Sequence, residues 1–279
     1  MVNVYEPGPL EGRLDQWPVL AVSGALEVRL AETDAEVEAA QRLRYHVFYE
    51  EMSAVPTPEM REERRDFDKF DSVCDHLLVI DRDKVEDDGQ PAVIGCYRMM
   101  REEHAKEVGG FYTAGEYDIS KLLAARQGAK MLELGRSCVL KEYRSRAGAL
   151  QLLWRGIMAY AARFSIDVMF GCASFAGIDP DAHAAALTYL HHNAALPQNI
   201  AVKALAHLYV DMDRMPIDQV NPKEALRDMP PLIKGYLRAG CYIGDGAVID
   251  RQFSTTDVFI YVPLDTMSER YRSRFGLSN

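Results

Sequence analysis

Residues 130–164, which read KMLELGRSCVLKEYRSRAGALQLLWRGIMAYAARF, carry the strongest fold signal in the chain. The first part, 130–140, predicts a strand with Gly135 as a candidate bulge. A basic turn over 141–148 follows. A helix is predicted over 149–164 because four apolar residues fall on one stripe. These residues are Leu152, Leu153, Ile157 and Ala161.

The segments on either side extend this unit into a larger sheet. Apolar residues at helical spacing predict a helix over 35–48. Two apolar runs, 76–80 and 92–100, flank turn-forming residues 87–91 and predict a β-hairpin. The other predicted elements are a loop at 50–75, a helix at 119–126, a strand at 167–170, a loop at 171–179, helices at 180–191 and 231–239, a turn at 244–246 and a strand at 257–263. We expect an α/β fold with a mixed, mainly antiparallel sheet. It forms one domain over 25–279, behind an N-terminal extension, 1–24, that proline and glycine interrupt.

The composition excludes several classes of protein. Hydrophobic residues make up 48% and charged residues 27% of the 279 residues, which excludes a disordered chain. The net charge of −10 argues against nucleic acid as a partner. Apolar runs are far shorter than the roughly 18 residues that span a bilayer. The first ten residues lack a signal-peptide pattern, so we expect a cytoplasmic protein.

The turn before the 149–164 helix is a candidate anion site. Free backbone N–H groups at a helix start and the helix dipole both favour negative charge. Residues 136–155 carry five basic side chains against one acid, Glu142, in an acidic chain. The basic residues are Arg136, Lys141, Arg144, Arg146 and Arg155. An anionic partner and a solvated helix start both fit this pattern.

The same turn resembles the pyrophosphate loop of the Gcn5-related N-acetyltransferases, written Gln/Arg-x-x-Gly-x-Gly/Ala. Arg144 matches the first position and Ala149 the last, whereas Ala147 replaces the first glycine. That departure favours a donor with one phosphate on a pantetheine arm, as in acyl carrier protein, over coenzyme A. The resemblance implies that the acyl donor binds Arg144, Arg146, Ala147, Gly148 and Ala149.

Four segments before this turn resemble the N-acyl homoserine lactone synthases, a branch of the same fold. They are the end of the first helix, an Asp-x-x-Asp pair, a hairpin arginine and a Glu-x-x-Arg pair. The matching residues are Arg44, Phe48, Asp68, Asp71, Arg98, Glu133 and Arg136. The resemblance implies a three-layer fold like that of the Gcn5-related acyltransferases. A charged network that braces the first helix would also produce this pattern.

Two later segments resemble another branch, the ornithine N-acyltransferases of ornithine-lipid synthesis. They are PPLIKGYLRAG at 230–240 and FSTTDV at 253–258. This resemblance implies transfer of a 3-hydroxyacyl group from acyl carrier protein to the α-amine of ornithine, without a cofactor. The product would be lyso-ornithine lipid. A homoserine lactone signal synthase, or a non-catalytic module that binds carrier protein or lipid, remain as alternatives.

The chemistry of the reaction suggests a role for each of the charged matching residues. An amine attacks a thioester directly, so the site needs a base, an oxyanion donor and groups that orient the amino acid. We expect Glu133 to act as the base, directly or through water. Asp68 and Asp71 can hold an ammonium group. The arginines that can pair with the substrate carboxylate are Arg44, Arg98 and Arg136.

The predicted 231–239 helix raises the question of membrane contact. Its apolar residues are Leu232, Ile233, Tyr236 and Leu237, and its basic residues are Lys234 and Arg238. Basic groups beside an apolar face suit peripheral contact with the anionic inner face of a membrane. A short helix packed on the core would look the same.

Other chemistries fit the sequence less well. His76 and Asp81 form an HxxxxD string, but five residues along a strand separate them by roughly 16 Å on opposite faces. His183, His191 and His192 lack the spacing of a zinc site, so we expect no metal. The five cysteines are Cys74, Cys96, Cys138, Cys172 and Cys241. They are odd in number without a CxxC pair, which indicates reduced thiols.

Overall fold

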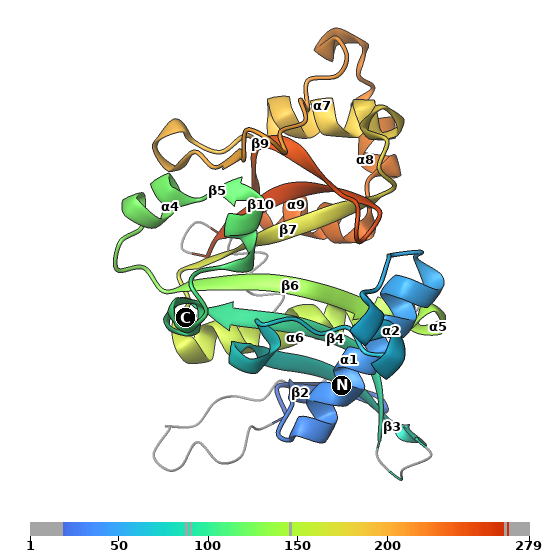
Figure 1. The fold of residues 1–279 in the computed structure, drawn as a ribbon. Coiled ribbons are helices and arrows are strands. Elements are labelled where there is room, and N and C mark those ends of the chain that lie inside the picture. Colours follow the sequence, from blue (N-terminus) through green and yellow to red (C-terminus); the bar gives the residue numbers. More distant parts are fainter. Residues whose placement is uncertain (1–18, 87–88, 90, 145–146, 265–266, 268–279) are drawn as a thin grey trace.

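The computed structural model describes residues 19–86, 89, 91–144, 147–264 and 267. Within them, one ten-stranded sheet runs through the molecule with helices on both sides (Figure 1). In spatial order its strands are β1 (Ala21–Ser23), β2 (Leu26–Leu30), β3 (Asp75–Val85), β4 (Pro91–Arg101), β6 (Met131–Val139), β7 (Val168–Ala176), β10 (Thr255–Pro263), β9 (Tyr242–Asp250), β8 (Lys203–Ala204) and β5 (Tyr117–Asp118).

The sheet is mixed and mainly antiparallel, as the sequence predicts. Only β6 with β7 and β8 with β9 pair in parallel, and the other neighbours are antiparallel. The predicted hairpin is β3 and β4, both longer than expected. Of its predicted turn, residues 87–88 and 90 lie outside the described part of the chain.

Helices cover the two faces and complete three layers (Figure 1). They are α1 (Asp34–Tyr45), α2 (Pro58–Glu63), α3 (Glu102–Glu107), α4 (Ser120–Ala125), α5 (Lys141–Arg144), α6 (Ala147–Phe164), α7 (Ala184–Asn193), α8 (Pro222–Asp228) and α9 (Pro231–Ala239). A π-helix, η1 (His46–Glu51), continues α1, and short 3₁₀ turns include η2 (Asp71–Val73), η3 (Tyr112–Gly115) and η4 (Pro180–His183).

The main core lies between the sheet and α6. The predicted apolar stripe of α6 faces this core, and each of its residues is at most 2% exposed. They are Leu152, Leu153, Ile157 and Ala161. Gly156 brings α6 close to β2, because an added Cβ would lie 2.9 Å from a methyl of Val28. On the other face α1 buries Ala40 and Leu43, and η1 buries Val47, against the sheet. The Thr33 hydroxyl caps α1 by accepting from the backbone N–H of Glu36.

Several predicted boundaries were wrong. The segment 50–75 contains α2, which Thr57 caps and Pro58 starts. Residues 171–176, predicted as loop, continue β7, and the predicted turn at 244–246 lies inside β9. Residues 21–23 of the predicted extension form β1, while residues 1–18 lie outside the described part. The basic turn contains the short helix α5.

Helix α9 packs on the core. Proline at its first position and Gly240 at φ +84° after its end match the predicted signature. Ile233 and Tyr236 are buried, and the Tyr236 hydroxyl bonds that of Tyr97 at 2.7 Å. The apolar side that suggested membrane contact is therefore directed at the core. Within the described residues, every helix is too short or too polar to cross a bilayer.

Candidate active site

A cavity opens where β6 and β7 separate. The two parallel strands pair over three positions, from Met131 opposite Val168 to Glu133 opposite Phe170. Beyond that point both strands line a cavity of about 260 Å³. Gly171 permits the last close approach, since an added Cβ would lie 2.2 Å from the carbonyl oxygen of Leu134. The charged residues that line the cavity are Arg98, Glu133, Arg136, Asp250 and Asp257.

Glu133, the predicted base, is held rigidly in the cavity wall. Its Oε1 accepts from the backbone N–H of Thr113 at 2.7 Å, and its Oε2 accepts from that of Tyr112 at 2.9 Å. The residue is 4% exposed. Burial raises the pKa of the Glu133 carboxyl, and the two N–H donors oppose that effect without cancelling it. A carboxyl with a raised pKa is a stronger base once ionised, which suits proton abstraction.

A bulge in β6 directs Arg136 toward the cavity. Arg98 pairs with Gly135 and Cys96 with Cys138, so β6 has one more residue than β4 between these pairs. Arg136 adopts φ +52°, a left-handed conformation that is uncommon outside glycine. The bulge predicted at Gly135 is therefore confirmed and is centred on the next residues. The Arg136 guanidinium lies 4.4 Å from the ring centre of Phe253 and 5.0 Å from that of Tyr112.

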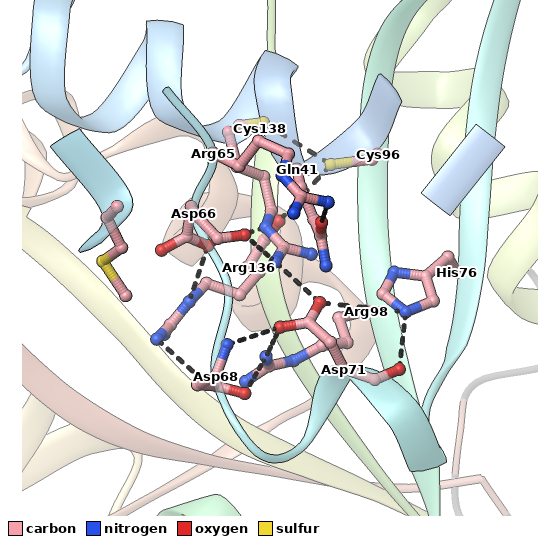
Figure 2. Close-up of polar contacts among 12 residues, drawn as sticks. Gln41, Arg65, Asp66, Asp68, Asp71, His76, Cys96, Arg98, Arg136 and Cys138 are labelled. Carbon is pink, nitrogen blue, oxygen red and sulfur yellow. Dashed lines mark hydrogen bonds and ion pairs between the residues drawn. The ribbon is translucent and has the colours of Figure 1, made fainter. Parts of the chain in front are cut away.

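One ion network of three arginines and three aspartates lies beside the cavity, and Figure 2 labels all of its residues except Arg44. The residues are Arg44, Arg98, Arg136, Asp66, Asp68 and Asp71. At its centre is Asp66, which Arg44 contacts through Nε at 2.7 Å and Arg136 through Nε at 3.3 Å. Arg44 also donates to Asp71 Oδ1 at 2.7 Å. Although burial alone would raise it, Arg44 holds the pKa of the Asp66 carboxyl below its ordinary value. The same balance, with Arg44 and Arg98, lowers the pKa of Asp71.

Arg98 joins this network to the cavity. Its Nη1 contacts Asp68 Oδ1 at 2.6 Å and Asp71 Oδ2 at 3.1 Å. Arg136 reaches the other oxygen of Asp68 at 3.2 Å. The three carboxylates of the network are thus matched by three guanidinium groups, as a buried network requires.

The structure separates the predicted substrate-binding residues into two groups. Phe48, Arg98 and Arg136 line the cavity, as does Glu133. Arg44, Asp68 and Asp71 are absent from its lining, and Arg44 is 1% exposed. Arg44 and Asp71 are buried, whereas the Asp68 side chain is 22% exposed, and all three belong to the ion network that holds the cavity arginines. Their contacts fit the charged-network alternative of the sequence analysis, and their predicted role in substrate binding stays a prediction.

A second group of acids closes another part of the cavity wall. Glu116, Asp250 and Asp257 have carboxylate oxygens within 4.8 Å of one another. Burial, with a smaller contribution from Asp250, raises the pKa of Asp257 to about 6. Burial and the nearby Asp257 raise that of Glu116 to about 7.

Comparison with known proteins identifies the family. Residues 43–155 match the model of the acetyltransferase (GNAT) domain. The chain is 49% identical over 258 residues to an L-ornithine N(alpha)-acyltransferase of Rhizobium meliloti, covering 92% of this chain and 86% of that protein. It is 52% identical to the Brucella abortus protein of the same name, covering 92% and 91%. The chain belongs to the L-ornithine N(alpha)-acyltransferase family.

Solved structures align at lower similarity. FeeM, an N-acyl amino acid synthase from uncultured soil microbes, aligns over 89% of this chain and 94% of its own with a TM-score of 0.48 and 13% identity. The acyl-homoserine lactone synthase LasI aligns over 90% and 94% with a TM-score of 0.47 and 12% identity. The family assignment favours the ornithine branch over the signal-synthase alternative.

In this member of the ornithine N-acyltransferase family, the turn predicted to bind the acyl donor, 144–149, lies partly within the described residues. Arg144 donates to the carbonyl oxygen of Val139 at 2.8 Å and pairs with Glu51 at 2.5 Å, which ties α5 to η1. Ala149 is buried and Gly148 is half-buried at the start of α6. Ala147 begins that helix, whereas Arg146 lies outside the described residues. Arg136 is enclosed by the ion network, so it does not belong to the basic surface.

The competing signals of the sequence find structural roles. His76 Nε2 lies 3.0 Å from the carbonyl oxygen of Asp71, and the Asp81 carboxylate accepts from the Tyr143 hydroxyl. His191 and His192 lie near the exposed Asp213, which bonds His192 at 2.8 Å. Burial raises the pKa of the Cys138 and Cys172 thiols, which keeps them protonated.

Sequence reasoning missed Asp66 and the three acids of the second cluster. Asp66 lies two residues before the Asp-x-x-Asp pair, in a charged stretch where no spacing marks it. Asp257 lies in the FSTTDV segment, which carried a family resemblance without a role. Asp250 and Glu116 come from other parts of the chain. Only the fold brings the three together.

Proposed function

We propose that this protein transfers a 3-hydroxyacyl group from acyl carrier protein to the α-amine of L-ornithine, for lipid synthesis. The observation that carries the proposal is the 49–52% identity, over 92% of the chain, to L-ornithine N(alpha)-acyltransferases. The cavity supports it, because one wall offers arginine, another a buried carboxylate base and a third a cluster of acids. An amino acid with two ammonium groups and one carboxylate matches these charges.

Arg98 is the group best placed for the substrate carboxylate. It lines the cavity and uses only Nη1 for its contacts with Asp68 and Asp71. The remaining N–H groups of its guanidinium can donate to a carboxylate in the cavity. Arg136 is more constrained, since its guanidinium is covered by Phe253 and Tyr112 as well as paired with two aspartates. It supplies positive potential at the bulge.

Glu133 accepts a proton from the α-ammonium, directly or through water. The freed amine attacks the thioester carbonyl, the C–N bond forms, and the tetrahedral intermediate collapses with cleavage of the C–S bond. The ammonium nitrogen loses two protons overall: one ends on the departing thiolate and one passes to solvent. Bulged residues lack ladder partners, so backbone N–H groups near Arg136 can stabilise the developing oxyanion.

The test is a direct assay of acceptor and donor. Purified protein is incubated with 3-hydroxyacyl carrier protein and L-ornithine, and fragmentation of the product in a mass spectrometer identifies which nitrogen carries the acyl group. We expect an amide on the α-nitrogen. Absence of acylated ornithine would refute the proposal, and a δ-amide would refute the assigned orientation.

The donor turn yields a prediction about salt. Changing Arg144 and Arg146 to Ala should raise the KM for acyl carrier protein by about tenfold at low salt and flatten its salt dependence, because screened charge pairs are lost. The KM for ornithine should stay constant. Arg227→Ala, an exposed arginine on α8, is the control. Carrier-protein kinetics that are unchanged at both salt concentrations would place the docking site elsewhere.

A further inference from the structure

Glu116, Asp250 and Asp257 form an acidic group that the reaction described above does not use. Asp250 ends β9, Asp257 lies on β10, and Glu116 follows η3. Register joins the strands, since Thr255 pairs with Asp250 and Asp257 with Val248. Asp250 and Asp257 both line the cavity, and Glu116 lies behind them with an oxygen within 4.8 Å of each.

Arginine acts on this acidic group at a distance, since the charge of Arg136 lowers the pKa of Asp257 and of Glu116 by less than burial raises them. Among the described residues, no lysine, arginine or histidine forms an ion pair with any of the three carboxylates. The Asp257 side chain is buried, and hydrogen bonds from the side chains of Thr255 and Ser174 lower its pKa less than burial raises it. Its Oδ1 nevertheless has no hydrogen-bond partner, and Glu116 has an Oε2 in the same condition. The neighbouring ion network is different, because each aspartate there contacts arginine.

An unpaired buried carboxylate is costly, so such groups in native proteins generally have a partner. The raised pKa values of Asp257 and Glu116 record this cost. A cation that enters the cavity would remove it. The atoms without partners therefore mark where a positively charged part of a ligand belongs.

The acidic group lies on the same face of the sheet as Glu133. Glu133 pairs with Phe170 of β7, and Asp257 pairs with Ser174 four residues along the same strand. Residues an even number apart share a face. Cys172 lies between them. Burial and then the charges of Glu116, Asp257 and Glu133 raise the pKa of its thiol. Arg98 is on the other side of Glu133, on β4. Arg98, which can bind the substrate carboxylate, the base Glu133 and the acidic group thus follow one another across the sheet.

We propose that Asp257, with Asp250 and Glu116, binds the side-chain ammonium of the amino acid acceptor. This inference rests on the proposed function and adds to it the feature that selects a diamino acid. An acceptor whose carboxylate meets Arg98 and whose terminal ammonium meets Asp257 presents its α-nitrogen to Glu133. The terminal nitrogen, held as a cation, is protected from acylation because it has no free electron pair.

A primary ammonium fits this group better than a metal ion does. It has three N–H donors for three carboxylates. Calcium requires six to eight oxygen ligands and magnesium a near-ideal octahedron. Asp250 and Asp257 instead face an open cavity that borders the base, with Glu116 behind them.

The experiment compares L-ornithine with L-norvaline, in which a hydrogen atom replaces the terminal ammonium, so that the side chain ends in a methyl group. The parent should favour ornithine in kcat/KM by about 100-fold, as expected when a buried polar site loses its partner. Asp257→Asn should reduce this preference at least about tenfold. The reduction should come from a higher KM for ornithine, with kcat/KM for norvaline equal or higher. Glu116→Gln should act in the same direction.

Binding without turnover gives a second readout. Ornithine should raise the melting temperature of the parent more than norvaline does, and this difference should vanish in Asp257→Asn. The variant removes a buried charge without a change in size, so it should fold. Asp213→Asn, an exposed aspartate outside the cavity, should behave like the parent.

Each contrary outcome has a distinct meaning. If the parent acylates ornithine and Asp257→Asn keeps the full preference, this inference is overturned and the proposed function stands. If the parent acylates no diamino acid, both are overturned. If magnesium or calcium stabilises the parent but not the variant, and a chelator abolishes activity, the acidic group is a metal site.

Discussion

Glu133→Gln is expected to lower kcat by at least about 100-fold, the contribution of a general base. The amide keeps the size of the side chain but cannot accept the proton of the α-ammonium. The variant should keep its fold because its oxygen can still accept from the backbone N–H of Thr113 or Tyr112. Steady-state turnover with saturating ornithine and acyl carrier protein measures the loss, and circular dichroism checks the fold.

The pH profile separates a base from a positioning group. In the parent, kcat should fall as the pH falls through the raised pKa of Glu133, because protonation removes the base. Glu133→Gln should lose this acidic limb, with an unchanged KM for the carrier protein. Saturation with ornithine keeps the titration of the acidic group out of kcat. Near-normal turnover, or an acidic limb that persists in the variant, would exclude Glu133 as the base.

The central part of the fold was predictable because hydrophobic periodicity alone determines it. The stripe of α6 is buried throughout, and β3, β4 and β6 fall where apolar runs predict strands. The family resemblance, which rests on local motifs spread between residues 44 and 258, was confirmed by the 49–52% identity to the family members. Glu133, Arg98 and Arg136 meet in the cavity because β4 and β6 are neighbours.

Two of the missed strand segments, in β7 and β9, contain glycines that have a packing role. Gly244 and Gly246 suggested a turn, yet they lie inside β9. There an added Cβ at Gly244 would lie 2.9 Å from Phe259, and one at Gly246 would lie 2.4 Å from Tyr209. Gly171 likewise suggested a loop but allows the close approach of β6 and β7. Sequence alone cannot distinguish a glycine that bends the chain from one that makes room for a neighbour.

The site was only partly predictable because its acids come from distant segments. The Asp-x-x-Asp motif predicted Asp68 and Asp71 as ligands of the substrate, whereas in the structure both pair with arginines outside the cavity lining. The acids that do face the cavity, Asp250 and Asp257, lie on a hairpin that motif matching left without a role. Their proximity depends on strand register, which no local pattern encodes.

Asp66→Asn is expected to destabilise the protein by about 3–5 kcal/mol, the cost of removing one member of a buried ion pair. Asp66 accepts from Arg44 at 2.7 Å and from the Tyr49 hydroxyl at 2.9 Å, and it pairs with Arg136 at 3.3 Å. The amide leaves two buried guanidinium groups with one charge too few. Urea unfolding should show a lower midpoint with an unchanged slope.

The control for this loss is Asp228→Asn, which removes the exposed pair between Arg227 and Asp228. Its midpoint should stay close to that of the parent, because water screens an exposed pair. The loss in Asp66→Asn should also extend to catalysis, since Arg136 would no longer be held at the bulge beside Glu133. If both variants unfold at the parent's urea concentration, Asp66 is not the centre of the network. The position of Arg136 would then depend on Asp68 and the rings of Phe253 and Tyr112.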